Sequence, residues 1–402
     1  MTRATFPLTI LLAGLVVVTV PPSVQDKQAS GAAAQFQSAA SSSAFPRYDR
    51  VLPLETTSET SANVSIGDLN GDGDLDIVLA KGRHWPLISR VLLGDGRGHF
   101  PIAYNLSETP YRSYSGRLVD IDGDRDLDVV LSNDTPDPKL TYLNDGKGHF
   151  HLGSSYGRPE WETRNASVVD VNGDGRPDII VANRTDKSPA NYICLNKGKG
   201  HFDADCIAFS HESATTITAA DFNHDGLIDM AVPNRDGGQS YVYLNSRNAT
   251  FSSLKRVPFG PPDAEIRMAE AADLDGTGFL DIIAIDERRG VNIYFGQKDG
   301  TFSAGLAVDN TKVTPYALAV RDLNHDGKID IVVGNVEAPS TIYFNDGSGR
   351  HYTPIHFGDN KGTVYGFAIA DLDRDGLPDI AAARSDAPNS VYFASLGPPK
   401  AP

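Results

Sequence analysis

The sequence predicts an all-β protein, a seven-bladed β-propeller built from four-stranded antiparallel blades. The first observation is a short aspartate loop that occurs seven times, beginning at Asp68, Asp120, Asp170, Asp221, Asp273, Asp322 and Asp371. Successive copies start 49 to 52 residues apart, which is the length of one structural repeat. The second observation is that each interval has room for four short strands, and four such strands make one propeller blade.

The second repeat shows how one blade is expected to form. Residues 115–119 predict a first strand that ends at the Asp loop, and the apolar residues 128–131 predict a buried second strand. Residues 140–143 and 149–152 predict the third and fourth strands. The segment between them, 144–148, carries glycines where a hairpin needs positive φ.

The two ends of the chain predict how the ring closes. After the seventh Asp loop the sequence offers only two more strands, so the last blade lacks its fourth strand. Residues 44–51 resemble the opening of a fourth strand, as seen at His99-Phe100 and His149-Phe150, yet no earlier strands precede them. We therefore expect the N-terminal strand to complete the last blade and leave no exposed edge.

These motifs resemble the FG-GAP/VCBS repeat family, which is known from the propellers of integrin α-subunits. The matching segment is 67–78, Gly-Asp-Leu-Asn-Gly-Asp-Gly-Asp-Leu-Asp-Ile-Val, together with its six relatives, and the resemblance covers residues 44–395. It implies a seven-bladed propeller with Ca²⁺ in the loop between the first two strands of a blade. It does not fix a function, because the fold serves adhesion proteins, lectins and enzyme-associated domains.

The Asp loops themselves predict up to seven Ca²⁺ sites. Calcium prefers six to eight oxygen ligands, which side chains at loop positions 1, 3, 5 and 9 and the carbonyl at position 7 can supply. The predicted metal ligands are Asp68, Asn70, Asp72, Asp74 and Asp76; Asp120, Asp122, Asp124 and Asp128; Asp170, Asn172, Asp174 and Asp178; Asp221, Asn223, Asp225 and Asp229; Asp273, Asp275, Thr277 and Asp281; Asp322, Asn324, Asp326 and Asp330; and Asp371, Asp373, Asp375 and Asp379.

Two copies deviate from this pattern and are expected to bind the ion less readily. The second has Arg125 at position 6, where the turn favours glycine, and the fifth has Thr277 at position 5. The alternative for every copy is an ion-free loop held by Asx turns. His224 and His325 stand at position 4 and are predicted to point outward without a function.

Charge and the N-terminus bear on partners and location. The net charge is −16, and nearly half of the 52 acidic residues lie in the Asp loops, which argues against nucleic-acid binding. An apolar run at 8–20 after Arg3 predicts a signal peptide (1–23), or alternatively an uncleaved anchor as the one membrane span, followed by a flexible linker (24–43) and the propeller (44–402). We expect a secreted, periplasmic or cell-surface protein.

Cys194 and Cys206 flank a predicted hairpin about three positions out of register, so their pairing stays open.

The face opposite the Asp loops is the predicted ligand surface. The candidate ligand-binding residues there are Trp85, Tyr111, Arg112, Trp161, Arg184 and Arg235. The other basic and aromatic residues of these loops include Lys81, Arg83, His84, Tyr114, Arg158, Arg164, Arg288, Arg289 and Arg384. Exposed aromatic and Arg side chains favour recognition of a glycan or an extracellular protein.

The sequence therefore favours a binding or adhesion module over an enzyme. It contains no Gly-x-Ser-x-Gly or His-Glu-x-x-His motif, and no catalytic residue is assigned. Two alternatives remain: a propeller enzyme of the polysaccharide lyase or hydrolase type, and a structural unit of a surface assembly.

Overall fold

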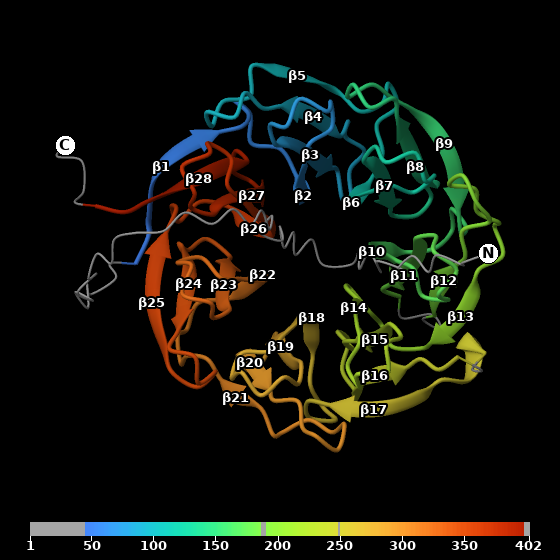
Figure 1. Cartoon of the computed structure of the whole chain (residues 1–402), viewed down its shortest axis with the longest axis vertical. Coiled ribbons are helices and arrows are strands. Elements are labelled where there is room, and N and C mark those ends of the chain that lie inside the picture. The colour runs from blue at the N-terminus through green and yellow to red at the C-terminus, as the bar shows by residue number, and fades with distance from the viewer. Residues whose placement is uncertain (1–44, 186–189, 248–249, 398–402) are drawn as a thin grey trace, which may run out of the picture.

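Seven four-stranded antiparallel sheets surround one axis in the computed structural model, which describes residues 45–185, 190–247 and 250–397 (Figure 1). The predicted signal peptide or anchor (1–23) and linker (24–43) lie outside the described residues. Among the described residues, no helix has the length and apolar character needed to cross a membrane. A single 3-10 turn, η1 (Phe251–Ser253), is the one helical element in this part of the chain.

Each blade takes its strands in sequence order from the axis outward. The first four blades are β2 (Ser61–Gly67), β3 (Asp76–Lys81), β4 (Arg90–Leu93) and β5 (Ile102–Asn105); β6 (Ser113–Val119), β7 (Asp128–Asn133), β8 (Lys139–Asn144) and β9 (Phe150–Tyr156); β10 (Thr163–Val169), β11 (Asp178–Asn183), β12 (Asn191–Cys194) and β13 (Ile207–Ser210); and β14 (Thr218–Ala220), β15 (Asp229–Val232), β16 (Ser240–Leu244) and β17 (Lys255–Phe259).

The last three blades follow the same order, and the seventh takes its outer strand from the N-terminus. They are β18 (Ile266–Ala272), β19 (Asp281–Asp286), β20 (Gly290–Tyr294) and β21 (Leu306–Ala307); β22 (Pro315–Arg321), β23 (Asp330–Asn335), β24 (Ser340–Asn345) and β25 (Tyr352–Phe357); and β26 (Thr363–Ala370), β27 (Asp379–Ser385), β28 (Ser390–Ser395) and β1 (Arg47–Pro53). The predicted seven-bladed fold is confirmed, with strands a few residues longer than expected in the second repeat.

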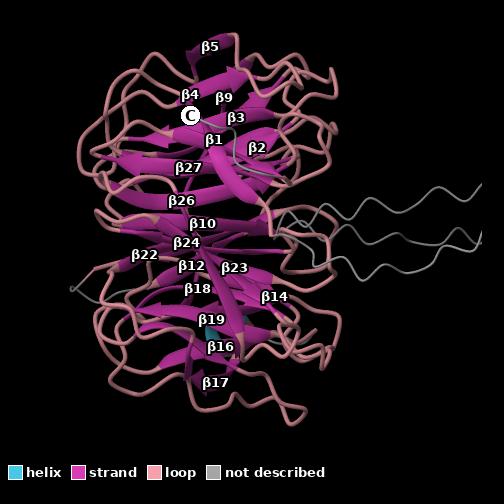
Figure 2. Ribbon diagram, turned by 90° about the vertical axis from the view of Figure 1, so that its left-hand side faces the viewer, coloured by secondary structure: helices cyan, strands magenta, loops and turns pink. Residues whose placement is uncertain are grey.

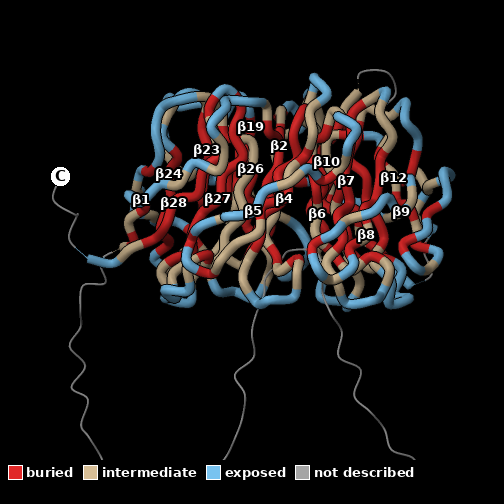
Figure 3. Tube along the Cα trace, turned by 90° about the horizontal axis from the view of Figure 1, so that it is seen from above, coloured by how far each residue is buried: buried red, intermediate tan, exposed pale blue. Residues whose placement is uncertain are grey.

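The hydrophobic core lies in layers between neighbouring blades rather than at one centre. The second strands are buried along their whole length, as β7 and β11 show, because a sheet covers each of their faces. Val78 and Val91 of the first blade, for example, pack against Val129 and Leu131 of the second. Figure 3 shows the buried strands running between the two faces of the propeller, where the exposed loops lie. Figure 2 shows the propeller edge-on from another side.

The N-terminal strand closes the ring as predicted. β1 pairs antiparallel with β28, with Val51 opposite Tyr392. Tyr48 is 3% exposed, and its hydroxyl donates to the carbonyl of Pro378 at 3.1 Å. Phe45 stacks on Phe344 of the sixth blade at a ring distance of 4.5 Å. The N-terminal segment therefore contacts both the other strands of the seventh blade and the neighbouring sixth blade.

Cys194 and Cys206 form a disulfide, with their Cα atoms 4.4 Å apart. The predicted register was wrong, because the hairpin closes at Asn196 and Phe202 and the next residues then bulge outward before β13 begins. Strand pairing resumes with Ile193 opposite Ile207, which brings Cys206 opposite Cys194.

Replacement of Tyr48 tests the closure. We expect Tyr48→Ala to lower the free energy of unfolding by about 3 kcal/mol or more, because it removes a buried aromatic ring from the contact between the sixth and seventh blades. The matched control is Val51→Ala in the same strand, where the side chain is 46% exposed and a change below about 0.5 kcal/mol is expected. Urea denaturation measures both, and equal effects of the two substitutions would contradict the proposed closure.

Candidate metal centres and the opposite face

The aspartate at loop position 9 is buried and fixed by two backbone N–H groups. At Asp128, one carboxylate oxygen accepts from the N–H of Ile121 at 2.9 Å and the other accepts from the N–H of Asn144 at 2.8 Å. The same pair of bonds occurs in all seven blades. The residue therefore joins its Asp loop to the third strand of the blade.

Burial raises the pKa of these position-9 carboxyls. It rises to about 6 at Asp76 and Asp281 and to about 7 at the other position-9 residues, Asp128, Asp178, Asp229, Asp330 and Asp379. Desolvation is the main cause, and neighbouring loop aspartates raise the pKa further, whereas the two N–H bonds lower it. A nearby cation would favour the ionised form of the whole cluster.

The first aspartate of each loop shapes the turn. In the second loop, Asp120 accepts from the N–H of Gly123 at 2.7 Å and from the N–H of Arg125 at 3.0 Å. Positions 4 and 6 both take positive φ, which is 89° at Gly123 and 84° at Arg125. The prediction that Arg125 adopts this strained conformation is confirmed, whereas the positive φ at position 4 was not foreseen.

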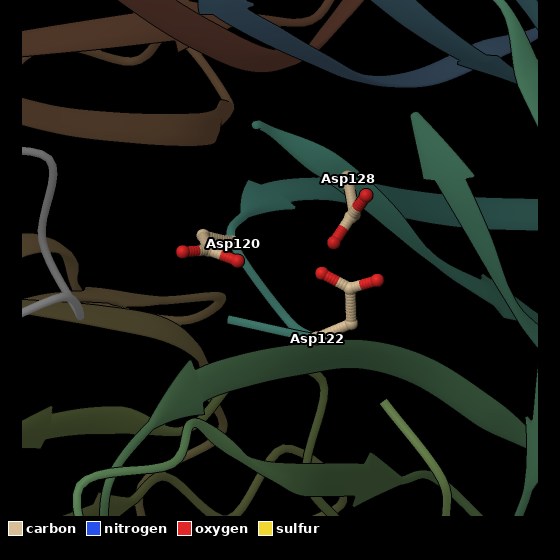
Figure 4. Close-up of side chains that lie close together, drawn as sticks. All are labelled: Asp120, Asp122 and Asp128. Carbon is tan, nitrogen blue, oxygen red and sulfur yellow. The ribbon is translucent and has the colours of Figure 1, made fainter. Parts of the chain in front are cut away.

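In three loops the carboxylates at positions 1, 3 and 9 converge. They are Asp120, Asp122 and Asp128 (Figure 4); Asp273, Asp275 and Asp281; and Asp371, Asp373 and Asp379. Each triplet brings three carboxylate oxygens within 4.8 Å of one another, so it can hold a metal ion. The donors are all oxygen, which suits a hard cation such as Ca²⁺. Two of these loops, the second and fifth, are the copies that deviate in sequence.

The other four loops carry asparagine at position 3, and its side-chain amide forms hydrogen bonds with the aspartate at position 5. In the first loop the Asn70 amide donates to Asp72 at 2.9 Å, and its carbonyl oxygen accepts from the N–H of Asp72 at 3.0 Å. Asn172, Asn223 and Asn324 do the same. An amide carbonyl is also a calcium ligand, but it adds no negative charge. These loops therefore offer oxygen ligands with less repulsion between carboxylates.

Position 4 links neighbouring loops around the ring. The His325 ring nitrogen lies 2.7 Å from the carbonyl oxygen of Gly376 in the next loop. Arg374 donates to the carbonyl of Gly73 at 2.8 Å and pairs with Asp74, so it joins the seventh loop to the first. His224 contacts Phe279 edge-on at 5.6 Å. Both histidines contact the adjacent blade, which the expectation that they point outward did not include.

The glycine-rich hairpins share the face of the Asp loops. Gly146 adopts a φ of 72°, and a Cβ atom there would lie 2.5 Å from a carboxylate oxygen of Asp126. Such close approach requires glycine. Because the first strand of each blade ends at the Asp loop, its beginning lies at the opposite face.

At that opposite face, five of the six predicted ligand residues are engaged within the protein. Arg112 pairs with Asp137 at 3.0 Å, Arg184 with Asp236 at 2.8 Å and Arg235 with Glu287 at 2.7 Å. Tyr111 forms a β-bridge with Leu87 and packs on the core, and Trp161 stacks on Tyr192 at 4.0 Å. Trp85 alone of the six is freely accessible, with 69% of its surface exposed.

The innermost strands carry a feature that the sequence analysis missed. In six of the seven, a β-bulge places one residue out of register near the start of the strand, six positions before the first aspartate of the loop. These bulge residues are Ala62, Tyr114, Arg164, Arg267, Tyr316 and Tyr365. Counting back from each Asp loop would have found the set, but nothing local marks it as a bulge.

Arginine and tyrosine side chains at these bulges contact one another around the axis. We call Arg83, Tyr114, Arg164, Arg267, Tyr316 and Tyr365 the axial ring. Arg164 lies over Tyr114 at 4.7 Å, Arg267 over Tyr316 at 3.4 Å and Arg83 over Tyr365 at 3.8 Å, while Tyr316 and Tyr365 meet edge-on at 4.5 Å. Arg83 comes from the loop after β3 rather than from a bulge, and the bulge residue of that blade is Ala62, the one small residue of the set.

The chain belongs to the FG-GAP-like repeat family, whose model matches residues 68–131, 120–181, 170–232, 221–284, 273–333 and 322–382. No curated protein matches the sequence.

Several solved propellers have a similar fold. They include an Agrocybe aegerita lectin described as recognising non-reducing terminal N-acetylglucosamine (19% identity, 83% of this chain and 87% of that chain, TM-score 0.55) and the BP39L lectin of Burkholderia pseudomallei (13%, 83% and 96%, 0.63). A third is BBS1N in complex with ARL6DN (12%, 88% and 97%, 0.59). At these identities the likeness establishes the fold alone.

Replacement of Arg125 by glycine tests the strained loop. In calcium-containing buffer we expect Arg125→Gly to raise the free energy of unfolding by about 1 kcal/mol, because glycine adopts the required positive φ without steric cost. The control is Arg97→Gly, which removes the same charge from a hairpin position whose φ is not positive and should be neutral or destabilising. Chemical denaturation compares the two, and a loss of stability in Arg125→Gly would count against the strain.

The raised pKa values predict an unusual pH dependence without metal. In chelator, stability should fall as pH rises from about 5 to about 8, because the folded position-9 carboxyls lose their protons there while those of the unfolded chain are already ionised above about pH 4. Excess calcium should reverse this trend, since the ion binds the ionised loops. Thermal melting at each pH, with and without calcium, measures the effect. Identical profiles in the two conditions would contradict metal binding.

Proposed function

We propose that this chain is an exported binding module whose Asp loops hold calcium ions and whose opposite face binds a glycan or an extracellular protein. The exposed indole of Trp85 is the observation that carries the proposal. It stands in the loop 82–89 with Arg83 and His84, on the face away from the Asp loops. A large aromatic side chain left in solvent within a charged loop is typical of recognition sites.

Calcium in the Asp loops would make that face rigid. Three converging carboxylate triplets supply the oxygen donors, and Asn70 and its equivalents supply amide oxygens in other loops. The loops also contact one another through His325 and Arg374. An ion that neutralises one loop would therefore stabilise that blade and its neighbour. Because the first strand runs from the Asp loop to the opposite face, it would also hold the opposite face in position.

The comparisons support binding as the class of function. Two of the similar propellers are lectins, and a third is described in complex with a protein partner. Those ligands belong to those proteins. For this chain, the basic and aromatic residues of the opposite face support a glycan or protein ligand, and the seven-loop repeat on the other face supports export to a calcium-rich medium.

A glycan and matrix-protein array, probed with and without EDTA, tests this proposal. We expect binding in calcium that weakens in EDTA, and a loss of about tenfold or more for Trp85→Ala, because stacking on the indole is removed. The control is Leu152→Ala, which truncates another exposed large apolar residue, on the outer strand β9. Equal binding by the two variants, or no binding to any array member, would contradict the proposed ligand face.

A further inference from the structure

The axial ring contains one cation that has no carboxylate partner. Arg164 pairs with Asp134 at 2.5 Å, and Arg267 pairs with Glu287 at 2.9 Å. No ion pair among the described residues includes Arg83. Its guanidinium stacks on Tyr365, lies 6.0 Å from the centre of the Tyr114 ring and reaches the Ser385 hydroxyl at 3.4 Å. Because Arg83 is half-buried and has no carboxylate partner, its terminal guanidinium nitrogens can bind an anion from outside the chain.

The pKa shifts of residues in and beside the axial ring also indicate an excess of positive charge there. Burial raises the pKa of Tyr316, yet Arg267 and Arg83 among its neighbours bring that pKa below its usual range. Burial lowers the pKa of His84, and Arg83 and Arg164 lower it further. Both shifts indicate a positive potential at the start of the innermost strands. This contrasts with the acidic loops at the other end of the same strands.

Arg83 is also held in an unusual backbone conformation. Its φ is 56°, in the left-handed region that side chains rarely adopt. Its backbone N–H donates to the carbonyl of Ser113 at 3.1 Å, which fixes the loop to the second blade. Strained residues of this kind collect at ligand-binding sites, where the surrounding structure holds them in position. The guanidinium carbon lies 6.0 Å from the centre of the Tyr114 ring and 3.8 Å from that of Tyr365.

We propose that Arg83 is the anchor for the carboxylate of an acidic sugar, and that Trp85 and the Tyr114–His84 pair provide the aromatic surface beside it. This inference rests on the proposed binding function and names its ligand class. A guanidinium takes a carboxylate in a two-point hydrogen bond, and an indole two residues along the same loop packs against a sugar ring. The rings of Tyr114 and His84 meet edge-on at 5.7 Å, and the Tyr114 ring centre lies 6.0 Å from the Arg83 guanidinium carbon. A simple acidic peptide side chain would use the guanidinium but leave the indole bare.

Calorimetric titration of the full chain in calcium buffer tests the assignment. The probes are trigalacturonic acid and sialyllactose, each compared with a neutral sugar, galactotriose and lactose. We expect at least one carboxylated sugar to bind about tenfold or more tightly than its neutral counterpart, because a charge-assisted bidentate bond is lost in the neutral sugar. Added salt should reduce that preference.

Arg83→Gly is the decisive variant, since glycine adopts a φ of 56° without strain and the fold should keep its stability. It should abolish the preference for the acidic sugar. The matched control is Lys199→Gly, which removes one positive charge from an exposed residue of φ 54° in the hairpin on the Asp-loop face. The affinity of the Lys199→Gly variant for the acidic sugar should stay within about twofold of that of the unchanged protein. Melting curves confirm that both variants are folded.

The outcomes separate this inference from the function on which it rests. Equal binding of acidic and neutral sugars, or an acidic preference that survives in Arg83→Gly, would overturn the Arg83 assignment while leaving a binding module. Arg83-dependent binding of a hexaglutamate peptide, with no acidic sugar bound, would overturn the sugar class in favour of a protein partner. Failure to bind any sugar, peptide or array protein would overturn both proposals.

Discussion

A buried carboxylate that accepts two backbone N–H bonds is the interaction on which each blade depends. At position 9 of every Asp loop, one oxygen holds the loop and the other holds the third strand, so three segments of the blade meet at one side chain. Without those bonds, burial of a carboxylate would cost several kcal/mol. Because burial raises the pKa of this side chain, the stability of the fold is linked to its protonation, and in three blades the same side chain belongs to a carboxylate triplet that could hold a metal ion.

The contacts between blades repeat with the same period as the loops. Asn144, Asn196, Asn245 and Asn345 each donate to the carbonyl at position 2 of the preceding loop, and Ser65 and Thr218 each donate to a carbonyl of the next innermost strand. Such bonds fix the angle between neighbouring sheets, whereas the apolar layers supply most of the stabilisation.

Most of the fold could be read from the sequence because its signals are local and repeated. The aspartate spacing, the buried second strands and the two incomplete ends each depend on a few neighbouring residues. The sequence was less informative where several blades act together. Trp161 lies in the loop before β10 and stacks on Tyr192 of β12, so its burial depends on how that loop packs against the blade. The register of Cys206 depends on the residues that follow Phe202. The axial ring was missed because its members are about 50 residues apart and its bulges leave no composition signal.

Departures from the repeat are therefore more informative about function than the repeat itself. A tyrosine or arginine at the first-blade bulge would have had the same chemistry as the other five bulge residues. The chain has Ala62 there, and the arginine that the first blade contributes to the ring is Arg83 of the following loop, held at a left-handed φ and without a carboxylate partner. A left-handed φ at a non-glycine residue costs free energy in the isolated protein, and an anion bound as proposed would balance the charge of Arg83 at that point.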